Sequence, residues 1–209
     1  LNSAYYFDGN SYIRIPDNDS LDFWPNQDFT IHFWIKTNNC VSNKNKGVDL
    51  ISKWDSRANP SNYPYSVRCI NGFIKGMKYA GANPFPTVKS ITLVDNGTYH
   101  SVSFVSDENQ LKLYINGKLE DITSYELNPE IQNDSDLYIG KRSTTNKNNF
   151  TGILDDIYIY NRSLRLEEIK ALTNLRDPIP PMAGSVQVNS NNDNTSSDNL
   201  TLTLTSRDS

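Results

Sequence analysis

The stretch Phe29-Thr-Ile-His-Phe-Trp-Ile-Lys36 decides the fold class of this chain. Every second residue in it is apolar, and the side chains between them are mostly polar or amphipathic. Strict alternation over eight residues is typical of a β-strand that buries one face against a core. The same parity predicts that His32 lies on the exposed face of this strand.

Shorter stretches with the same alternation recur along the chain, at residues 12–15, 111–115, 137–139 and 157–159. Turn signals stand between the strands, including Asp8-Gly9-Asn10, Asn71-Gly72, Asn96-Gly97 and Asn116-Gly117. Many short alternating strands with regular turns predict an all-β fold, a two-sheet antiparallel sandwich. One helix is expected at residues 164–172, with Ser163 as its N-cap.

Length and charge exclude several classes of protein. The 209 residues are enough to bury a large core, and aromatic residues make up 11% of them. The net charge of −4 gives no basic footprint for nucleic acid. No run of 18 apolar residues exists, so we expect no membrane insertion. The chain starts without Met, which indicates a piece of a longer protein.

The composition changes at Arg176 and predicts a domain boundary there. Residues 1–175 carry the sandwich pattern, and residues 176–183 form a Pro-rich linker that is stiff and extended. Residues 184–209 contain a run of Leu alternating with Thr, which predicts a strand. We expect this segment to be the first strands of a following β module.

Several stretches, taken in order, resemble the bacterial laminin-G-like, concanavalin-A-like lectin jelly-roll domain. They are Tyr6-Phe7-Asp8-Gly9 with residues 12–16, then residues 29–36, 51–55, 97–118 and 150–162. The sequence departs at Tyr99-His100-Ser101, where the family usually has Trp-His-His. The resemblance implies a jelly roll over residues 1–175. The segment after it resembles the start of an immunoglobulin-like repeat of surface adhesins.

A structural calcium is expected near the N-terminus. Strand parity places Asp155 on the inward face with Ile157, and a buried carboxylate needs a cation or several donors. Asp8 lies in a tight turn, and the resemblance implies calcium at this position in related carbohydrate-binding domains. The candidate ligands are therefore Asp8, Asn10 and Asp155. The alternative is that both aspartates accept backbone N–H groups.

The two cysteines are Cys40 and Cys69. Their spacing of 29 residues fits no metal motif, because zinc sites need pairs of close ligands. In an extracellular chain they would form one disulfide. The alternative is two free thiols that pack as small apolar groups.

Aromatic residues gather in a segment that is rich in Asn, Pro and Gly. Trp54, Tyr63, Tyr65 and Tyr79 lie there, and apolar faces of sugars stack on such rings. They are the candidate ligand-binding residues. The alternative is that they pack in the core or at sheet edges.

Nothing in the sequence indicates an enzyme. The two histidines, His32 and His100, belong to no catalytic or zinc motif. Glycoside hydrolysis needs two carboxylates that flank one bond on a rigid surface, and the six glutamates lie on the expected helix, in loops or at strand ends.

Two function classes follow. The first is a non-catalytic lectin-like module, extracellular or on the cell surface, in a multidomain adhesin. Its partners would be a glycan or surface polysaccharide and neighbouring immunoglobulin-like modules. The second is a structural spacer that contacts neighbouring protein domains.

Overall fold

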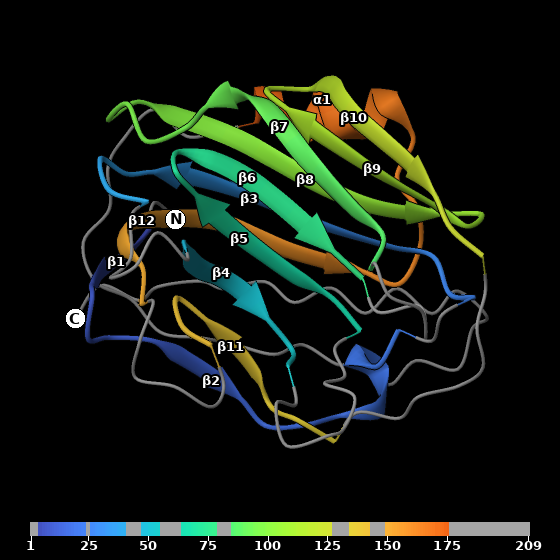
Figure 1. Ribbon diagram of the computed structural model, residues 1–209, viewed down its shortest axis with the longest axis horizontal. Helices are drawn as coiled ribbons and strands as arrows, with labels where there is room; N and C mark the ends of the chain where they lie inside the picture. Colours follow the sequence, from blue (N-terminus) through green and yellow to red (C-terminus); the bar gives the residue numbers. More distant parts are fainter. Residues whose placement is uncertain are drawn as a thin grey trace.

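The computed structural model describes residues 4–23, 26–40, 47–54, 64–78, 85–126, 134–142 and 149–175. Within these ranges the chain forms two antiparallel sheets of six strands each and one short α-helix. Figure 1 shows the sheets as two layers, with the helix beside one of them. The two-sheet sandwich predicted from the alternation is confirmed.

The order of strands in each sheet places distant parts of the sequence side by side. Sheet A runs β1 (Tyr5–Asp8), β12 (Thr151–Tyr160), β3 (Phe29–Lys36), β8 (Tyr99–Asp107), β9 (Gln110–Ile115) and β10 (Lys118–Ser124). Sheet B runs β2 (Ile13–Ile15), β11 (Leu137–Ile139), β4 (Val48–Ser52), β5 (Ser66–Ile70), β6 (Phe73–Met77) and β7 (Thr87–Leu93). A short 3-10 helix, Asp19–Leu21, follows β2.

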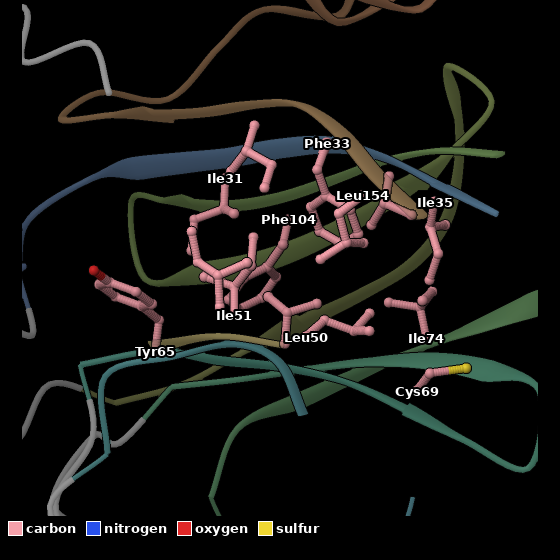
Figure 2. Close-up of a cluster of buried hydrophobic side chains, with 14 of the residues drawn as sticks. Ile31, Phe33, Ile35, Leu50, Ile51, Tyr65, Cys69, Ile74, Phe104 and Leu154 are labelled. Atoms are coloured by element: carbon pink, nitrogen blue, oxygen red, sulfur yellow. The ribbon is translucent and has the colours of Figure 1, made fainter. Parts of the chain in front are cut away.

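The core fills the space between the two sheets, as Figure 2 shows. The four alternating apolar residues of β3 are all fully buried there. Leu50 of β4 and Ile74 of β6 face them from sheet B. The alternation in β3 therefore buries one face of the strand, as predicted from the sequence, and its apolar side chains form the centre of one layer of the core.

Helix α1 (Leu166–Asn174) covers part of the outer face of sheet A. Leu164 and Ile169 pack there against Val105 of β8 and Tyr114 of β9. The predicted N-cap, Ser163, lies two residues before the observed one, Arg165. The backbone N–H of Arg165 donates to the Glu168 carboxylate at 2.8 Å.

None of the described residues forms a helix long and apolar enough to cross a membrane. Residues 176–209, which hold the predicted linker and the predicted strand of Leu and Thr, lie outside the described residues.

Candidate functional site

A row of side chains crosses the outer face of sheet B, the face turned away from the core. Strand register places its members opposite one another on all six strands: Arg14, Tyr138, Ser52, Ser66, Met77 and Thr87. Paired residues of antiparallel strands point to the same side of a sheet. These residues therefore form one continuous strip.

A second row on the same face contains a buried ion cluster. Asp49 of β4 lies opposite Arg68 of β5, and their charged atoms are 3.0 Å apart. Arg142, which follows β11, reaches the same carboxylate at 3.3 Å. Burial raises the pKa of Asp49, and the two guanidinium groups oppose that shift. Two fixed cations thus share one carboxylate.

A register irregularity brings this cluster to the outer face. Asp49 lies opposite Arg68, whereas Ile51 lies opposite Val67, so β4 has one extra residue between the two pairs. Such a bulge lets both Leu50 and Ile51 enter the core while Asp49 and Ser52 stay on the other side.

Trp54 lies next to the ion cluster. The Arg142 guanidinium carbon is 4.3 Å from the centre of the indole ring, a cation–π arrangement. Met77 and Phe85 pack with Trp54 in one small apolar cluster. The same arginine therefore contacts both a carboxylate and an aromatic ring.

Two tyrosines and the buried Lys141 lie together at one end of this face. The rings of Tyr12 and Tyr138 are 5.9 Å apart. Lys141 Nζ is 4.1 Å from the centre of the Tyr12 ring and 5.6 Å from that of Tyr138. Tyr12 remains 45% exposed, so its ring is available to a partner in solution.

The predicted aromatic platform is corrected in part. Trp54 does lie on the outer face of sheet B, half-buried. Tyr65 is fully buried and packs against Phe23 and Phe29 in the core, so it offers no surface for a sugar (Figure 2). Tyr63 and Tyr79 lie outside the described residues.

The predicted calcium ligands do not come together. In the β1–β12 register Asp8 lies opposite Thr151, and Asp155 is four residues further along β12, roughly 13 Å away. Asp8 instead closes a turn: its carboxylate accepts the backbone N–H groups of Asn10 at 2.8 Å and Ser11 at 2.7 Å. These bonds lower the pKa of Asp8 to about 2.

The inward orientation predicted for Asp155 is also wrong. Along β12, Asp155 lies opposite Trp34 and Tyr158 lies opposite His32, so β12 has one extra residue there. Asp156 takes the positive φ of 46° that this bulge requires. The bulge reverses the parity, so that the buried residue before it is Leu154 and Asp155 is left half-exposed. No group of three His, Cys, Asp or Glu side chains able to hold an ion occurs within the described ranges.

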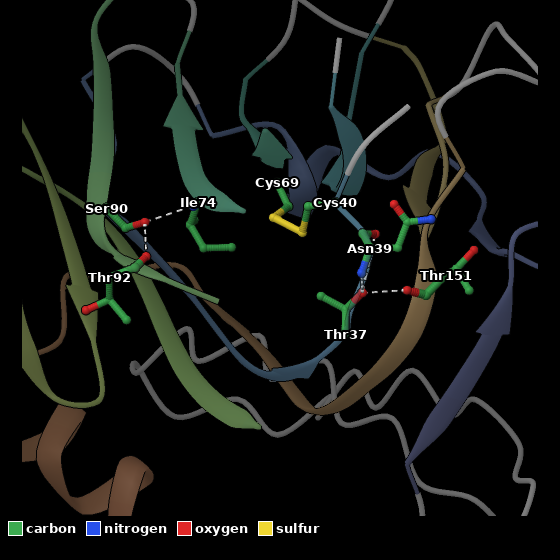
Figure 3. The surroundings of a disulfide bond; sticks show 8 residues. All are labelled: Thr37, Asn39, Cys40, Cys69, Ile74, Ser90, Thr92 and Thr151. Carbon is green, nitrogen blue, oxygen red and sulfur yellow. Dashed lines mark hydrogen bonds between the residues drawn. A yellow bond between two sulfur atoms is a disulfide. The ribbon is translucent and has the colours of Figure 1, made fainter. Parts of the chain in front are cut away.

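Cys40 and Cys69 are joined by a disulfide (Figure 3). Their Cα atoms are 5.4 Å apart, and both side chains are fully buried in the core cluster. Close by, the Thr37 hydroxyl donates to the carbonyl of Thr151 at 2.7 Å. The bond ties the segment after β3 to β5, one in each sheet.

His32 is fully buried, although parity predicted an exposed position. Its side chain does point away from the core, and Nδ1 is 2.8 Å from the Ser103 hydroxyl of β8. The ring also stacks on Tyr158 of β12. Burial lowers its pKa to about 4.

Sequence reasoning missed most of the residues on the outer face of sheet B. Tyr138 stands between two core residues, and Asp49 stands between Val48 and Leu50. Alternation alone therefore places both outside the core. It gives no sign that they meet, because β11 and β4 are far apart in sequence and only the strand order makes them neighbours.

The family model described as the concanavalin A-like lectin/glucanases superfamily (Laminin_G_3) matches residues 7–170. The chain belongs to this family of β-sandwich domains. It is 31% identical over 175 residues to Paraclostridial mosquitocidal protein 1 of Paraclostridium bifermentans. That match covers 79% of this chain and only 14% of the larger protein.

Solved structures with the same fold include binding domains. The binding domain of Paraclostridial mosquitocidal protein 1 matches 82% of this chain and 43% of its own, with a TM-score of 0.63 and 24% identity. Domain 4 of an extracellular arabinanase from Geobacillus stearothermophilus was solved with arabinotriose. The match covers 81% of this chain and 76% of that domain's chain, with a TM-score of 0.59 and 19% identity. The match to the botulinum neurotoxin serotype D binding domain covers 82% of this chain and 41% of that chain, with a TM-score of 0.61 and 17% identity. At these identities the likeness establishes the fold alone.

Proposed function

We propose that this chain is a non-catalytic, carbohydrate-binding module that holds its ligand on the outer face of sheet B. The observation that carries the proposal is the pair of tyrosine rings, Tyr12 and Tyr138, beside Lys141 and the Arg142–Trp54 contact. Aromatic faces for the apolar side of a sugar, with polar groups around them, are the usual elements of a sugar site.

The relatives support a binding role. Two of the matched structures are described as binding domains, and the arabinanase domain was solved with an arabinose trisaccharide. A non-enzymatic role agrees with the chemistry of the described face, because Asp49 is held between two arginines and is not placed opposite a second carboxylate.

The biological setting belongs to the same proposal. A buried disulfide fits a secreted or cell-surface protein, where such bonds persist. The chain spans 14% of its curated relative. Its place as one module of a multidomain adhesin with immunoglobulin-like neighbours is part of the proposal. The proposal includes no calcium ion shared by Asp8 and Asp155, because the register separates these two residues.

One observation favours the second candidate, a spacer that contacts other protein domains. Four exposed apolar side chains lie on β7 and β10, two neighbouring edge strands of the two sheets: Ile91, Leu93, Leu119 and Ile122. Exposed apolar groups that gather in one place mark protein contacts. A spacer would use this edge and leave the outer face of sheet B without a ligand.

Glycan binding by the full chain tests the proposal. On a broad glycan array we expect saturable binding, and Tyr12→Ala should weaken it about tenfold because the stacking ring is lost. Tyr6→Ala is the matched control, since Tyr6 is 70% exposed on β1 of sheet A. Silence on the array, or equal losses in both variants, would contradict a sugar site on this face.

A further inference from the structure

We propose that Asn71-Gly72 is a modification site, at which the Asn71 carboxamide is converted to a carboxylate without an enzyme. This inference goes beyond the proposed function and is independent of it. The chain contains three Asn-Gly dipeptides, Asn71-Gly72, Asn96-Gly97 and Asn116-Gly117. The sequence predicts that all three lie in turns. The surroundings of their side chains differ, and these decide which of the three reacts.

The reaction joins the Gly72 nitrogen to the Asn71 side chain. The nitrogen attacks Cγ, so that an N–Cγ bond forms and the Cγ–Nδ2 bond breaks, and the N–H proton leaves with the amide group as ammonia. Water then opens the cyclic imide. Hydrolysis at Cγ gives an aspartate side chain, whereas hydrolysis at the backbone carbonyl gives an isoaspartate with a longer main chain. Glycine favours the attack, because no Cβ crowds its nitrogen.

Asn71 and Asn116 form a matched pair, because they occupy the same position in the same kind of turn. Each is the first residue of a two-residue hairpin loop, between β5 and β6 and between β9 and β10. The angle φ is 52° at both asparagines, and it is 84° at Gly72 and 72° at Gly117. These positive values are typical of a type I′ turn. Backbone geometry therefore does not distinguish the two sites.

The side-chain contacts do distinguish them. Asn116 Oδ1 accepts the Ser101 N–H at 3.0 Å, and Asn116 Nδ2 lies 3.1 Å from His100 Nδ1. Asn71 is exposed, and its side chain makes no hydrogen bond with the described part of the chain. The Asn71 carboxamide can therefore turn toward the Gly72 nitrogen without losing a hydrogen bond, whereas that of Asn116 must first lose two.

The third dipeptide is held at both reacting groups. Asn96 Oδ1 accepts the backbone N–H of Thr98 at 3.0 Å and its hydroxyl at 2.7 Å, and lies 3.1 Å from His100 Nε2. The Gly97 N–H, which would be the attacking group, donates to the Thr37 carbonyl at 2.9 Å. His100 is buried and thus contacts the carboxamides of two of the three asparagines.

Conversion at Asn71 changes the end of the β5–β6 hairpin. It adds one negative charge to a chain whose net charge is −4. This charge lies one residue from Gly72, on which the Asp95 carboxylate packs, so the two carboxylates repel each other. The isoaspartate product cannot keep a two-residue type I′ turn, because its main chain is longer.

Peptide mapping by mass spectrometry measures the conversion at each dipeptide in the full chain, incubated at pH 8 and 37 °C. In the folded chain we expect Asn71 to convert at least about tenfold faster than Asn116 or Asn96, because a held site reacts only when it opens locally. The same chain, reduced and unfolded in urea, is the control. There all three should convert at similar rates, since glycine follows each asparagine.

His100→Ala tests the protection. It removes the contacts with Asn116 and Asn96, so their conversion should rise about fivefold while that of Asn71 stays unchanged. If this variant fails to fold, the comparison of the folded with the unfolded unaltered chain decides alone. An unchanged rate at Asn116 in folded His100→Ala overturns the proposal. Equal rates at Asn71 and Asn116 in the folded unaltered chain also overturn it, as does an Asn71 that converts in urea and not in the folded chain.

Discussion

Side chains that point away from the core differ widely in how exposed they are to solvent. His32 and Tyr6 both point away from the core of sheet A. Tyr6 on the edge strand is 70% exposed, whereas His32 on a central strand is fully enclosed. An outward position therefore does not by itself make a group available to solvent or ligand.

The enclosure of His32 should make stability depend on pH. Its folded pKa of about 4 lies below the unfolded value of about 6.5, so below pH 6.5 the unfolded chain binds a proton that the folded chain does not. The stabilisation is complete above pH 6.5 and falls as the pH drops toward 4, by about 3 kcal/mol. Urea unfolding at pH 7.5 and pH 4 measures it. The free energy of unfolding of His32→Gln should fall less between pH 7.5 and pH 4 than that of the unaltered chain. An equal fall in both would contradict the assignment of this pH dependence to His32.

Residue types in the candidate site were partly predictable, and their partners were not. Trp54 was predicted to contribute to a sugar surface and lies on the outer face of sheet B, but the prediction for Tyr65 was wrong because a Tyr can fill a core as well as a surface. Asp155 was wrong because one extra residue in β12 reverses every later side chain. No signal in the local sequence marks that insertion.

A bulge in β10, the edge strand of sheet A, places a side chain against β7, the edge strand of sheet B. On β10 the register shifts between Leu119 and Asp121. The Glu120 carboxylate accepts the backbone N–H groups of Ile91 at 2.7 Å and Thr92 at 2.9 Å, both on β7. Side chains thus satisfy donors on the outer edge of sheet B, which protects that edge from pairing with another chain.

The disulfide between the segment after β3 and β5 should contribute much of the stability. It closes a loop of 29 residues, and closing such a loop in the unfolded chain stabilises the fold by about 3 to 4 kcal/mol. We expect the free energy of unfolding of the double variant Cys40→Ala/Cys69→Ala, measured in urea, to be lower by that amount. The unaltered chain, fully reduced, should unfold at a similar urea concentration. A loss below about 1 kcal/mol would show that the cross-link adds little.

At the scale of the molecule, the fold was predictable because period-two alternation is a local signal that each strand carries by itself. The first strand, β1, pairs with the last, β12, although almost the whole described chain separates them. The outer face of sheet B is a property of the strand order: Arg14, Ser52 and Tyr138 lie in one row although the sequence separates them widely. Such a face emerges only when the sheet is assembled.

The described sandwich should be stable without the segment that follows it. Among the described residues, the two largest core clusters draw on positions between Tyr5 and Leu172, so a chain that ends at residue 175 keeps all of them. We expect its melting temperature to stay within about 2 °C of the full chain, which corresponds to less than about 1 kcal/mol. A chain that ends at residue 163 is the control, because it removes the fully buried Ile169 and exposes Val105 and Tyr114. It should melt several degrees lower. If the chain that ends at 175 also loses 5 °C or more, the run of Leu and Thr at 200–205 packs on the sandwich and does not belong to a following module.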